Sequence, residues 1–285
     1  MITLEQLQTG IVIPVDKPRQ WTSFQAVNKI KAVVRNTYGQ RATSGATASI
    51  KDGLKKFKIG HAGTLDPLAT GLLLVCIGKA TKTIPQLQDG DKVYTGTLVF
   101  GATTPCYDLE RPVDHYYPYE HITPELLDET VRQFTGTILQ VPPMFSAVKI
   151  AGQRAYEYAR TDDPTVTIQP KPVNVYSFEI TAFRNNQNIQ NIQNIPTTQN
   201  IPTTQNLPTK NLYQNPLGEV PPHLPQADFR IHCGKGTYIR SLARDLGLAL
   251  GSGAFLSALR REKVGDYTIN QAIKLDDVQQ FLTSL

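Results

Sequence analysis

Hydrophobic and polar positions along the chain predict short strands and amphipathic helices. The longest uninterrupted apolar run spans residues 72–77, which is typical of a buried strand. Segments rich in β-branched residues predict further strands, and apolar residues three or four positions apart predict helices. On these criteria we expect strands at 11–15, 72–77, 93–101 and 228–233, and helices at 24–35, from 124 to near Gly136, at 239–250 and from about Asp276. We expect the strand at 93–101 to pair with the strand at 72–77.

A turn-rich loop with a single acid, Asp66, precedes the run at 72–77. Glycines at 60, 63 and 71 allow positive φ and close approach of backbones. Pro67 biases Asp66 towards an extended backbone and removes the next amide donor. A carboxylate on such a loop is suited to act as a nucleophile or general base. An Asp-Pro turn without chemistry explains the same residues, so the loop alone decides neither interpretation.

Residues 185–215 differ in composition from the rest of the chain. About half of them are Asn or Gln, and the unit N-I-P-T-T-Q occurs at 194 and again at 200. Such a composition cannot bury a hydrophobic core. Prolines continue the irregular segment, and we therefore expect a disordered, low-complexity insertion at 185–226.

Composition favours a soluble globular protein. The chain has 285 residues, of which 40% are hydrophobic, enough to bury a core. No segment is typical of a signal peptide or a membrane span, so we expect a cytoplasmic location and no membrane contact. The three cysteines are scattered and the five histidines show no metal-ligand spacing, which argues against a disulfide framework and against a metal site.

The net charge of +5 is modest, but the basic residues are unevenly distributed. Residues 29–58 hold eight Lys or Arg residues and one acid, and they lead directly into the Asp66 loop. Such a segment would attract a polyanion to the candidate site, although a solvated lysine face is the alternative. Further basic groups occur at 260–263 and in a helix predicted to carry Arg154 and two tyrosines. These groups are suited to phosphates and bases, but packing alone also accounts for the tyrosines.

Familiar nucleotide-binding and serine-nucleophile motifs are not complete in this sequence. Gly78-Lys79 lacks the first glycine and the following Ser or Thr of a P-loop, and no G-x-S-x-G segment occurs. The turn at 234–240 is rich in glycine and precedes a predicted helix, which is only weak support for an anion site.

Five blocks of the sequence together resemble the TruB family of tRNA pseudouridine synthases. They are V-D-K-P with T-S-F at 15–24, G-H-A-G-T-L-D-P-L-A-T-G at 60–71, D-K-V-Y at 91–94, P-P-M-F-S-A-V-K at 142–149 and K-G-T-Y-I-R-S-L-A-R-D-L-G at 235–247. The block around Asp66 is highly specific for this family. The block at 235–247 is specific for it only in a sequence that also contains the Asp66 block. The resemblance covers nearly the whole chain outside the insertion.

The resemblance implies a fold, an activity and a partner. The fold is the α+β pseudouridine synthase core, a mixed and mostly antiparallel sheet flanked by helices, in one catalytic domain over 1–285 interrupted by the insertion. The activity is cofactor-independent isomerisation of the T-loop uridine at position 55 of tRNA to pseudouridine, with base flipping. The expected partner is the T arm of tRNA, with no obligate protein partner. Many bacterial members append a PUA RNA-binding domain, which we expect this chain to lack.

The resemblance also implies the roles of individual residues. Asp66 is the nucleophile that forms a covalent adduct with the target uridine, with attack at C1′ or C6 left open. Arg240 matches the arginine that pairs with this aspartate. Tyr94 matches the tyrosine that stacks on the target base and assists proton transfer, and Tyr238 matches a further active-site tyrosine. His61 matches a histidine that enters the T loop and fills the space left by the flipped base.

Several basic residues are expected to serve RNA binding. Lys17 matches a lysine of the first block, which we expect to support the catalytic loop or to contact RNA. Lys58, Arg154 and Arg260 are the other basic groups that we expect to bind RNA.

Two departures from the family pattern put local geometry in question. Gln20 occupies a position where the family usually has glycine, and Phe145 replaces a tyrosine and loses its hydroxyl. A competing function is an RNA-binding or tRNA-folding protein, which would not need a carboxylate such as Asp66 near phosphates. A hydrolase of small molecules would not need the basic stretch at 29–58.

Overall fold

The computed structural model describes residues 2–41, 58–146, 149–150, 153–154, 168–185 and 217–284. The contacts divide the chain into two compact units, which we call unit 1 (Met1–Tyr94 and Leu259–Leu285) and unit 2 (Thr95–Ala258). Residues 186–216 of the expected insertion lie outside the described residues. A single catalytic domain over 1–285 stays a prediction.

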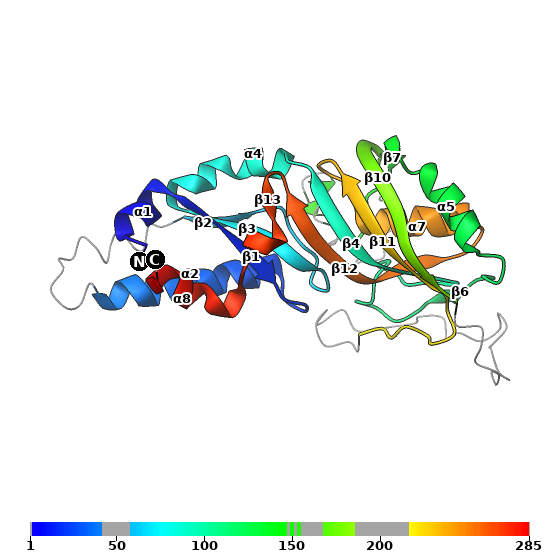
Figure 1. Cartoon of the computed structure of the whole chain (residues 1–285), viewed down its shortest axis with the longest axis horizontal. Coiled ribbons are helices and arrows are strands. Elements are labelled where there is room, and N and C mark those ends of the chain that lie inside the picture. The colour runs from blue at the N-terminus through cyan, green and yellow to red at the C-terminus, as the bar shows by residue number, and fades with distance from the viewer. Residues whose placement is uncertain are drawn as a thin grey trace. The chain divides into compact units, whose positions relative to one another are not determined.

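Unit 1 is a mixed sheet with helices on both faces (Figure 1). Its strands are β1 (Ile11–Lys17), β2 (Ile59–Ala62), β3 (Thr70–Ile77), β13 (Tyr267–Thr268), β14 (Ile273–Lys274), the start of β4 (Lys92–Phe100) and the end of β12 (Ala254–Val264). Its helices are α1 (Leu4–Thr9), α2 (Ser23–Arg41), α4 (Ile84–Asp89) and α8 (Val278–Ser284), with 3₁₀ turns η1 (Gly78–Thr83), η2 (Ile269–Gln271) and η3 (Leu275–Asp277).

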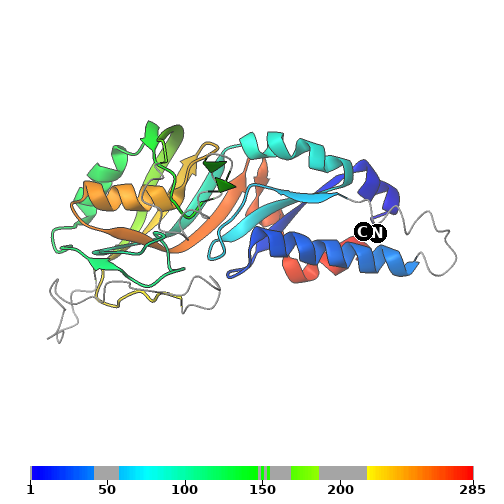
Figure 2. The same cartoon turned by 180° about the vertical axis from the view of Figure 1, so that it is seen from behind.

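Burial on both faces explains the apolar run in β3. Leu73, Val75 and Ile77 pack into one core cluster with residues of α2 and α8. Leu72 and Leu74 point to the opposite face, where residues of α4 pack against them. Figures 1 and 2 show α4 on one side of β3 and the adjacent helices α2 and α8 on the other. The predicted buried strand and the predicted helix at the start of α2 are thus confirmed.

The neighbours of β3 correct one prediction. β3 pairs with β1 and β2 in antiparallel and with β12 in parallel orientation, and β1 pairs in parallel with β14. β12 lies between β3 and β4, so the predicted pairing of 93–101 with 72–77 is wrong. The chain leaves β3 through η1 and α4 instead of turning back in a hairpin. The second half of β12 carries Arg260, Arg261 and Lys263. Because these residues are charged, the hydrophobic pattern did not predict a strand there.

Unit 2 consists of strands and two helices. It contains the rest of β4 and β12, together with β5 (Ala102–Thr103), β6 (His115–Tyr116), α5 (Pro124–Arg132), β7 (Gly136–Gln140), β8 (Lys149–Ile150), β9 (Gln153–Arg154), β10 (Lys171–Arg184), β11 (Gln226–Cys233) and α7 (Ile239–Ala249). β10 pairs in antiparallel orientation with both β7 and β11. α7 lies in front of these strands in Figure 2, and α5 contacts both β10 and α7.

Two local expectations in unit 2 also change. Arg154 lies in β9, which pairs with β8, and not in a helix. The rest of the helix expected at 155–160 lies outside the described residues. The predicted strand at 228–233 begins at Gln226, and Leu224 just before it is already fully buried. The mixed, mostly antiparallel sheet flanked by helices is confirmed.

Candidate active site

Asp66 is held on a short loop whose flanking residues are buried in the core of unit 1. The loop connects β2 to β3, and the carbonyl of Asp66 accepts a hydrogen bond from the amide of Ala69 at 3.1 Å. Leu65 and Ala69 belong to the core cluster and are 4% and 2% exposed. Asp66 itself is half-buried. The carboxylate is therefore carried by a turn that is anchored on both sides.

Lys17, at the end of β1, binds the backbone of this loop through its side chain. Its side chain is fully buried, and its ammonium donates to the carbonyls of Pro18 (3.0 Å), Trp21 (2.6 Å) and Pro67 (3.2 Å). Three acceptors match the three N–H donors of an ammonium. Pro67 directly follows Asp66, so of the two expected roles the geometry favours support of the loop over contact with RNA.

The loop is also held at its start and at its end. Arg261 of β12 is 1% exposed, and it donates to the carbonyls of Leu72 (2.8 Å) and Gly63 (3.1 Å). The hydroxyl of Ser23, the first residue of α2, donates to the Leu65 carbonyl at 3.2 Å and accepts from the Leu65 amide at 2.9 Å. The sequence placed Arg261 only in a basic cluster, and the charge pattern gave no signal of this role.

Gln20, at the position where the family usually has glycine, has a backbone conformation that glycine adopts without strain. Its backbone has φ +67°, in the left-handed region that disfavours residues with a Cβ. Its amide donates to the carbonyl of Pro67 at 2.8 Å, the same carbonyl that Lys17 binds. Gln20 therefore adds backbone strain to a turn that is bonded to the Asp66 loop.

Tyr94 lies on β4 and His61 lies on β2. Tyr94 is half-buried on β4 and packs against the core cluster that also holds Leu65 and Ala69. His61 is half-buried on β2, opposite Val75 of β3. Burial lowers the pKa of His61, which the backbone of Gly63 only partly offsets. Among the described residues, no partner lies within strict hydrogen-bond geometry of the His61 Nδ1 atom.

The two basic residues of unit 1 expected to bind RNA differ in their surroundings. Lys58 is exposed directly before β2. Arg260 forms a two-pronged ion pair with Asp16 at 2.9 and 3.1 Å, and lies 3.5 Å from Glu262. Hydrogen bonding to Asp16 raises the pKa of Arg260. Unit 1 thus already compensates much of the charge of Arg260, whereas Lys58 presents its side chain to solvent.

Arg240 and Tyr238 belong to unit 2, at the start of α7. The amide and carbonyl of Tyr238 are both bonded to the side chain of the buried Gln140, at 2.8 and 3.1 Å. Arg240 is 5% exposed and donates to the carbonyls of Cys106 (3.2 Å) and Phe145 (2.8 Å). Because Phe145 contributes its backbone, replacing the family's tyrosine leaves this bond unaffected.

Asp108 forms an ion pair with Arg240 that the local sequence pattern does not reveal. Its carboxylate is 3.8 Å from Nε of Arg240 and accepts the amide of Glu110 at 3.0 Å. Asp108 is 5% exposed, so its charge needs such a partner. Asp108 lies outside the five blocks, and its distance of more than a hundred residues from Arg240 left no signal in the local pattern.

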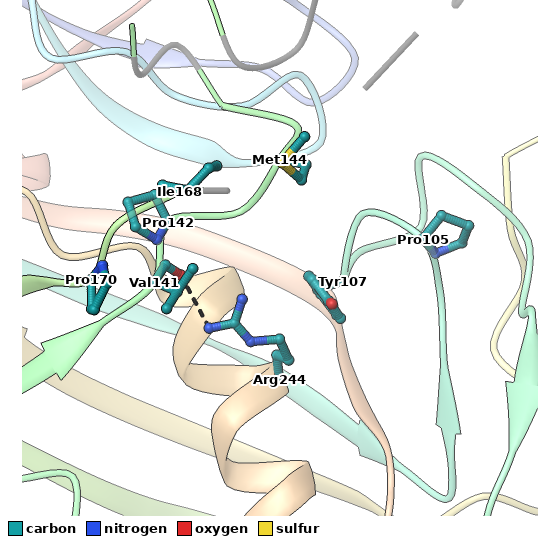
Figure 3. Close-up of a pocket in the computed structure, with 8 residues that line it drawn as sticks. All are labelled: Pro105, Tyr107, Val141, Pro142, Met144, Ile168, Pro170 and Arg244. Carbon is teal, nitrogen blue, oxygen red and sulfur yellow. Dashed lines mark hydrogen bonds between the residues drawn. The ribbon is translucent and has the colours of Figure 1, made fainter. Parts of the chain in front are cut away.

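A pocket of about 420 Å³ lies beside the residues that hold Arg240 (Figure 3). Its walls are Pro105, Tyr107, Val141, Pro142, Met144, Ile168, Pro170 and Arg244. Figure 3 shows the guanidinium of Arg244 directed at the Val141 carbonyl, to which it donates at 3.0 Å. The same guanidinium is 5.6 Å from the centre of the Tyr107 ring. The pocket therefore offers apolar surface with one aromatic ring and one cation at its edge.

Across the described residues, no group of three or more His, Cys, Asp and Glu side chains is placed to hold a metal ion. No helix in the described part of the chain is long and apolar enough to cross a membrane. The side chain of Arg154 lies outside what the structure describes.

Comparison with known proteins links two segments of the chain to one family. Residues 51–200 match the family model "TruB family pseudouridylate synthase (N terminal domain)", and residues 240–284 match "tRNA pseudouridylate synthase B C-terminal domain". The chain is 44% identical over 284 residues to the tRNA pseudouridine synthase B of Flavobacterium johnsoniae, covering 100% of both chains. It is 39% identical over 273 residues to that of Phocaeicola vulgatus, covering 96% of this chain and 93% of the relative.

Solved structures support the fold. The chain is similar to one in a Cbf5-Nop10-Gar1 complex, with a TM-score of 0.58 and 24% identity. It is also similar to one in an H/ACA RNP bound to a substrate RNA containing 2′-deoxyuridine, with a TM-score of 0.55 and 22% identity. The matches cover 96% and 98% of this chain but only 55% and 56% of those chains, and they show that this chain has the pseudouridine synthase fold.

Replacing Arg261 is expected to destabilise the protein far more than replacing its neighbour. Arg261→Met leaves the buried carbonyl of Leu72 and the part-buried carbonyl of Gly63 without their donor, which costs about 2–4 kcal/mol. Arg260→Met removes a part-exposed ion pair and should cost within about 1 kcal/mol. Urea unfolding of both variants measures the difference. Equal losses would contradict the assignment of Arg261 as one of the residues that hold the loop.

Replacing Gln20 by glycine is expected to stabilise the protein. Gln20→Gly relieves the left-handed strain and should raise the free energy of unfolding by up to about 1 kcal/mol. Gln20→Ala serves as the control, because it shortens the side chain and keeps the Cβ. Thermal and urea unfolding report the change. A gain in the alanine variant as large as in the glycine variant would show that the side chain, and not the backbone, is responsible.

Proposed function

Because the chain belongs to the TruB family of pseudouridine synthases, we propose that it converts a uridine of tRNA to pseudouridine. The observation that carries this proposal is the anchoring of the Asp66 loop. Lys17, Ser23 and Arg261 hold backbone groups on both sides of Asp66. A turn without chemistry needs no such support, whereas a nucleophile needs a fixed position relative to its target.

In this proposal Asp66 acts as the nucleophile. A carboxylate needs no cofactor for this role, provided that it is ionised and oriented. Its oxygen forms a bond with the target nucleotide while the bond between the uracil nitrogen and the sugar breaks. The base turns, its C5 atom forms a bond to the sugar, and the bond to Asp66 is released. C5 then gives up its proton and N1 gains one, so the step balances. The product has the same atoms as the substrate, so no oxidant, reductant or leaving group is needed.

We propose Arg240 as the cation that keeps Asp66 ionised, as the resemblance implies. An arginine stays charged even when buried, and a guanidinium can bind both oxygens of a carboxylate. Within unit 2, the Cys106 and Phe145 carbonyls and Asp108 orient the guanidinium. These contacts support a positioning role for Asp108.

Three further residues are proposed to handle the base. Tyr94 would stack on the target uracil and assist proton transfer, and Tyr238 would line the site at the start of α7. His61 would enter the RNA loop as a neutral ring, since burial lowers its pKa. Extruding a base costs a few kcal/mol, which stacking of this ring partly offsets.

The finer identity of the substrate is also a proposal. We propose that the target is the uridine at position 55 in the T arm, that no protein partner is required, and that the reaction takes place in the cytoplasm, where tRNA is abundant. We propose Lys58 as an RNA contact, because its side chain is exposed and it directly precedes β2, the strand that leads into the Asp66 loop. Arg154 and Arg260 are proposed as further RNA contacts, Arg260 through the exposed part of its side chain.

The proposal is tested by following uridine conversion in unmodified tRNA. We expect Asp66→Asn to bind tRNA within about threefold of the wild type and to lose at least about 1,000-fold in turnover, because it lacks the nucleophile. Asp128→Asn, a change of an exposed aspartate on α5, is the matched control and should convert tRNA at the wild-type rate.

The outcomes separate the parts of the proposal. Binding without conversion by the wild type would reject catalysis and favour an RNA-binding or tRNA-folding protein. Full activity of Asp66→Asn would reject the nucleophile while leaving the reaction. Conversion of a uridine outside the T arm would reject the proposed target while leaving Asp66 in its role.

A further inference from the structure

The exposed face of α2 begins next to the Asp66 loop. Ser23, the first residue of α2, makes two hydrogen bonds to the backbone of Leu65, which directly precedes Asp66. Reciprocal bonds between Thr22 and Gln25, at 2.8 and 3.0 Å, fix the first turn. The side chains on this turn are therefore held at a fixed position relative to the loop.

Phe24 lies on this first turn with its ring in solvent. It is 68% exposed, and among the large hydrophobic side chains that the structure describes only Leu139 is more exposed. The next residues in the sequence that face the core are Ala26 and Val27, so Phe24 is not needed to seal the core. A single exposed hydrophobic residue is common, and a binding role requires an independent observation.

The charge of α2 is that independent observation. Ser23–Arg41 contains four Lys or Arg residues and no Asp or Glu. Exposed residues follow Phe24 along one side of the helix at helical spacing: Asn28, Ala32 and Arg35. This stripe from Phe24 to Arg35 is about 16 Å long at 1.5 Å per residue. It carries an aromatic ring at one end and a cation at the other.

Part of the basic charge of α2 is used inside unit 1. Lys29 is bonded to Asp276 and lies 5.4 Å from the centre of the Trp21 ring. Arg35 is exposed and Lys31 is half-buried. Arg19 adds an exposed cation in the turn before α2. Lys29 is thus neutralised by Asp276, whereas Arg35 in the stripe and Arg19 and Lys31 near it leave this surface positively charged.

We infer that the stripe from Phe24 to Arg35 binds the substrate RNA, with Phe24 stacked on an unpaired base and Arg35 at a phosphate. This inference rests on the proposed function and adds a surface to it. Exposed aromatic rings next to cations are suited to unpaired nucleotides, because every base offers a π face and every linkage a charge. The polar Asn28 between them fits a nucleic acid better than an apolar protein surface. A base that loses its neighbour when the target is extruded gains a new stacking partner in Phe24.

The test of stacking is tRNA binding in the Asp66→Asn chain, where no turnover occurs. We expect Phe24→Ala and Phe24→Leu to raise the Kd about tenfold, the loss typical of one base stack, and Phe24→Tyr to stay within about twofold. Leu248→Ala, which changes a side chain that is 66% exposed on α7, is the control and should bind like its parent. In the chain with Asp66 intact, Phe24→Ala should raise the KM more than it lowers kcat.

The test of the charge is the salt dependence of the same binding. Arg35→Ala should lower the slope of log K against log salt by about one, whereas Phe24→Ala should leave the slope unchanged. Thermal unfolding of each variant confirms that the fold is kept.

Each other outcome counts against the inference. Unchanged Kd in Phe24→Ala would reject the surface, and recovery of binding in Phe24→Leu would replace stacking by a simple apolar contact. An unchanged salt slope in Arg35→Ala would reject the phosphate contact. These results are separate from the proposed function, which fails only if the chain with Asp66 intact does not convert uridine.

Discussion

The buried ammonium of Lys17 is the interaction on which the geometry of the Asp66 loop depends. Removing such a charge from water costs several kcal/mol unless hydrogen bonds replace the lost hydration. Lys17 meets this need with three carbonyls, and the one from Pro67 ties the end of β1 to the residue after Asp66. Because the buried ammonium must stay hydrogen-bonded, the carbonyls that accept from it are held in fixed positions. The Pro67 carbonyl is one of them, so the backbone next to Asp66 is held in place as well.

The same principle operates in unit 2. Arg240 is buried and reaches the carbonyls of Cys106 and Phe145, which come from two segments far apart in the sequence, as well as the carboxylate of Asp108. Both units thus use a buried cation to bring irregular loops to a defined place. The sheets and helices form the rigid part of each unit, and the buried cations bind loop carbonyls and so fix the loops relative to it. This division of roles explains why so many of the site residues are basic but inaccessible.

The local sequence pattern predicted individual strands, helices and motif blocks. The burial and the partners of single side chains depend on contacts between distant parts of the chain, which the local pattern does not contain. The apolar run 72–77, the spacing in α2 and the block around Asp66 are visible in the sequence itself. Arg260 and Arg261 are neighbours of the same type, and only their placement on opposite faces of β12 makes one part-exposed and the other buried. Asp108 gave no local signal, because its partner Arg240 lies far along the chain. In β10, buried Val173 and Val175 alternate with exposed Asn174, a period of two that is typical of a strand.

The most direct test of the central claim is the single-turnover rate of Lys17→Met on unmodified tRNA, with tRNA affinity and thermal unfolding measured alongside. Methionine keeps much of the length of the side chain and removes the donors that hold Pro67. We predict that the folded variant binds tRNA within about threefold of the wild type and converts uridine at least about 100-fold more slowly, the loss expected when a reacting group is displaced by about 1 Å. Conversion at the wild-type rate by folded Lys17→Met would contradict the claim that this buried ammonium positions the nucleophile.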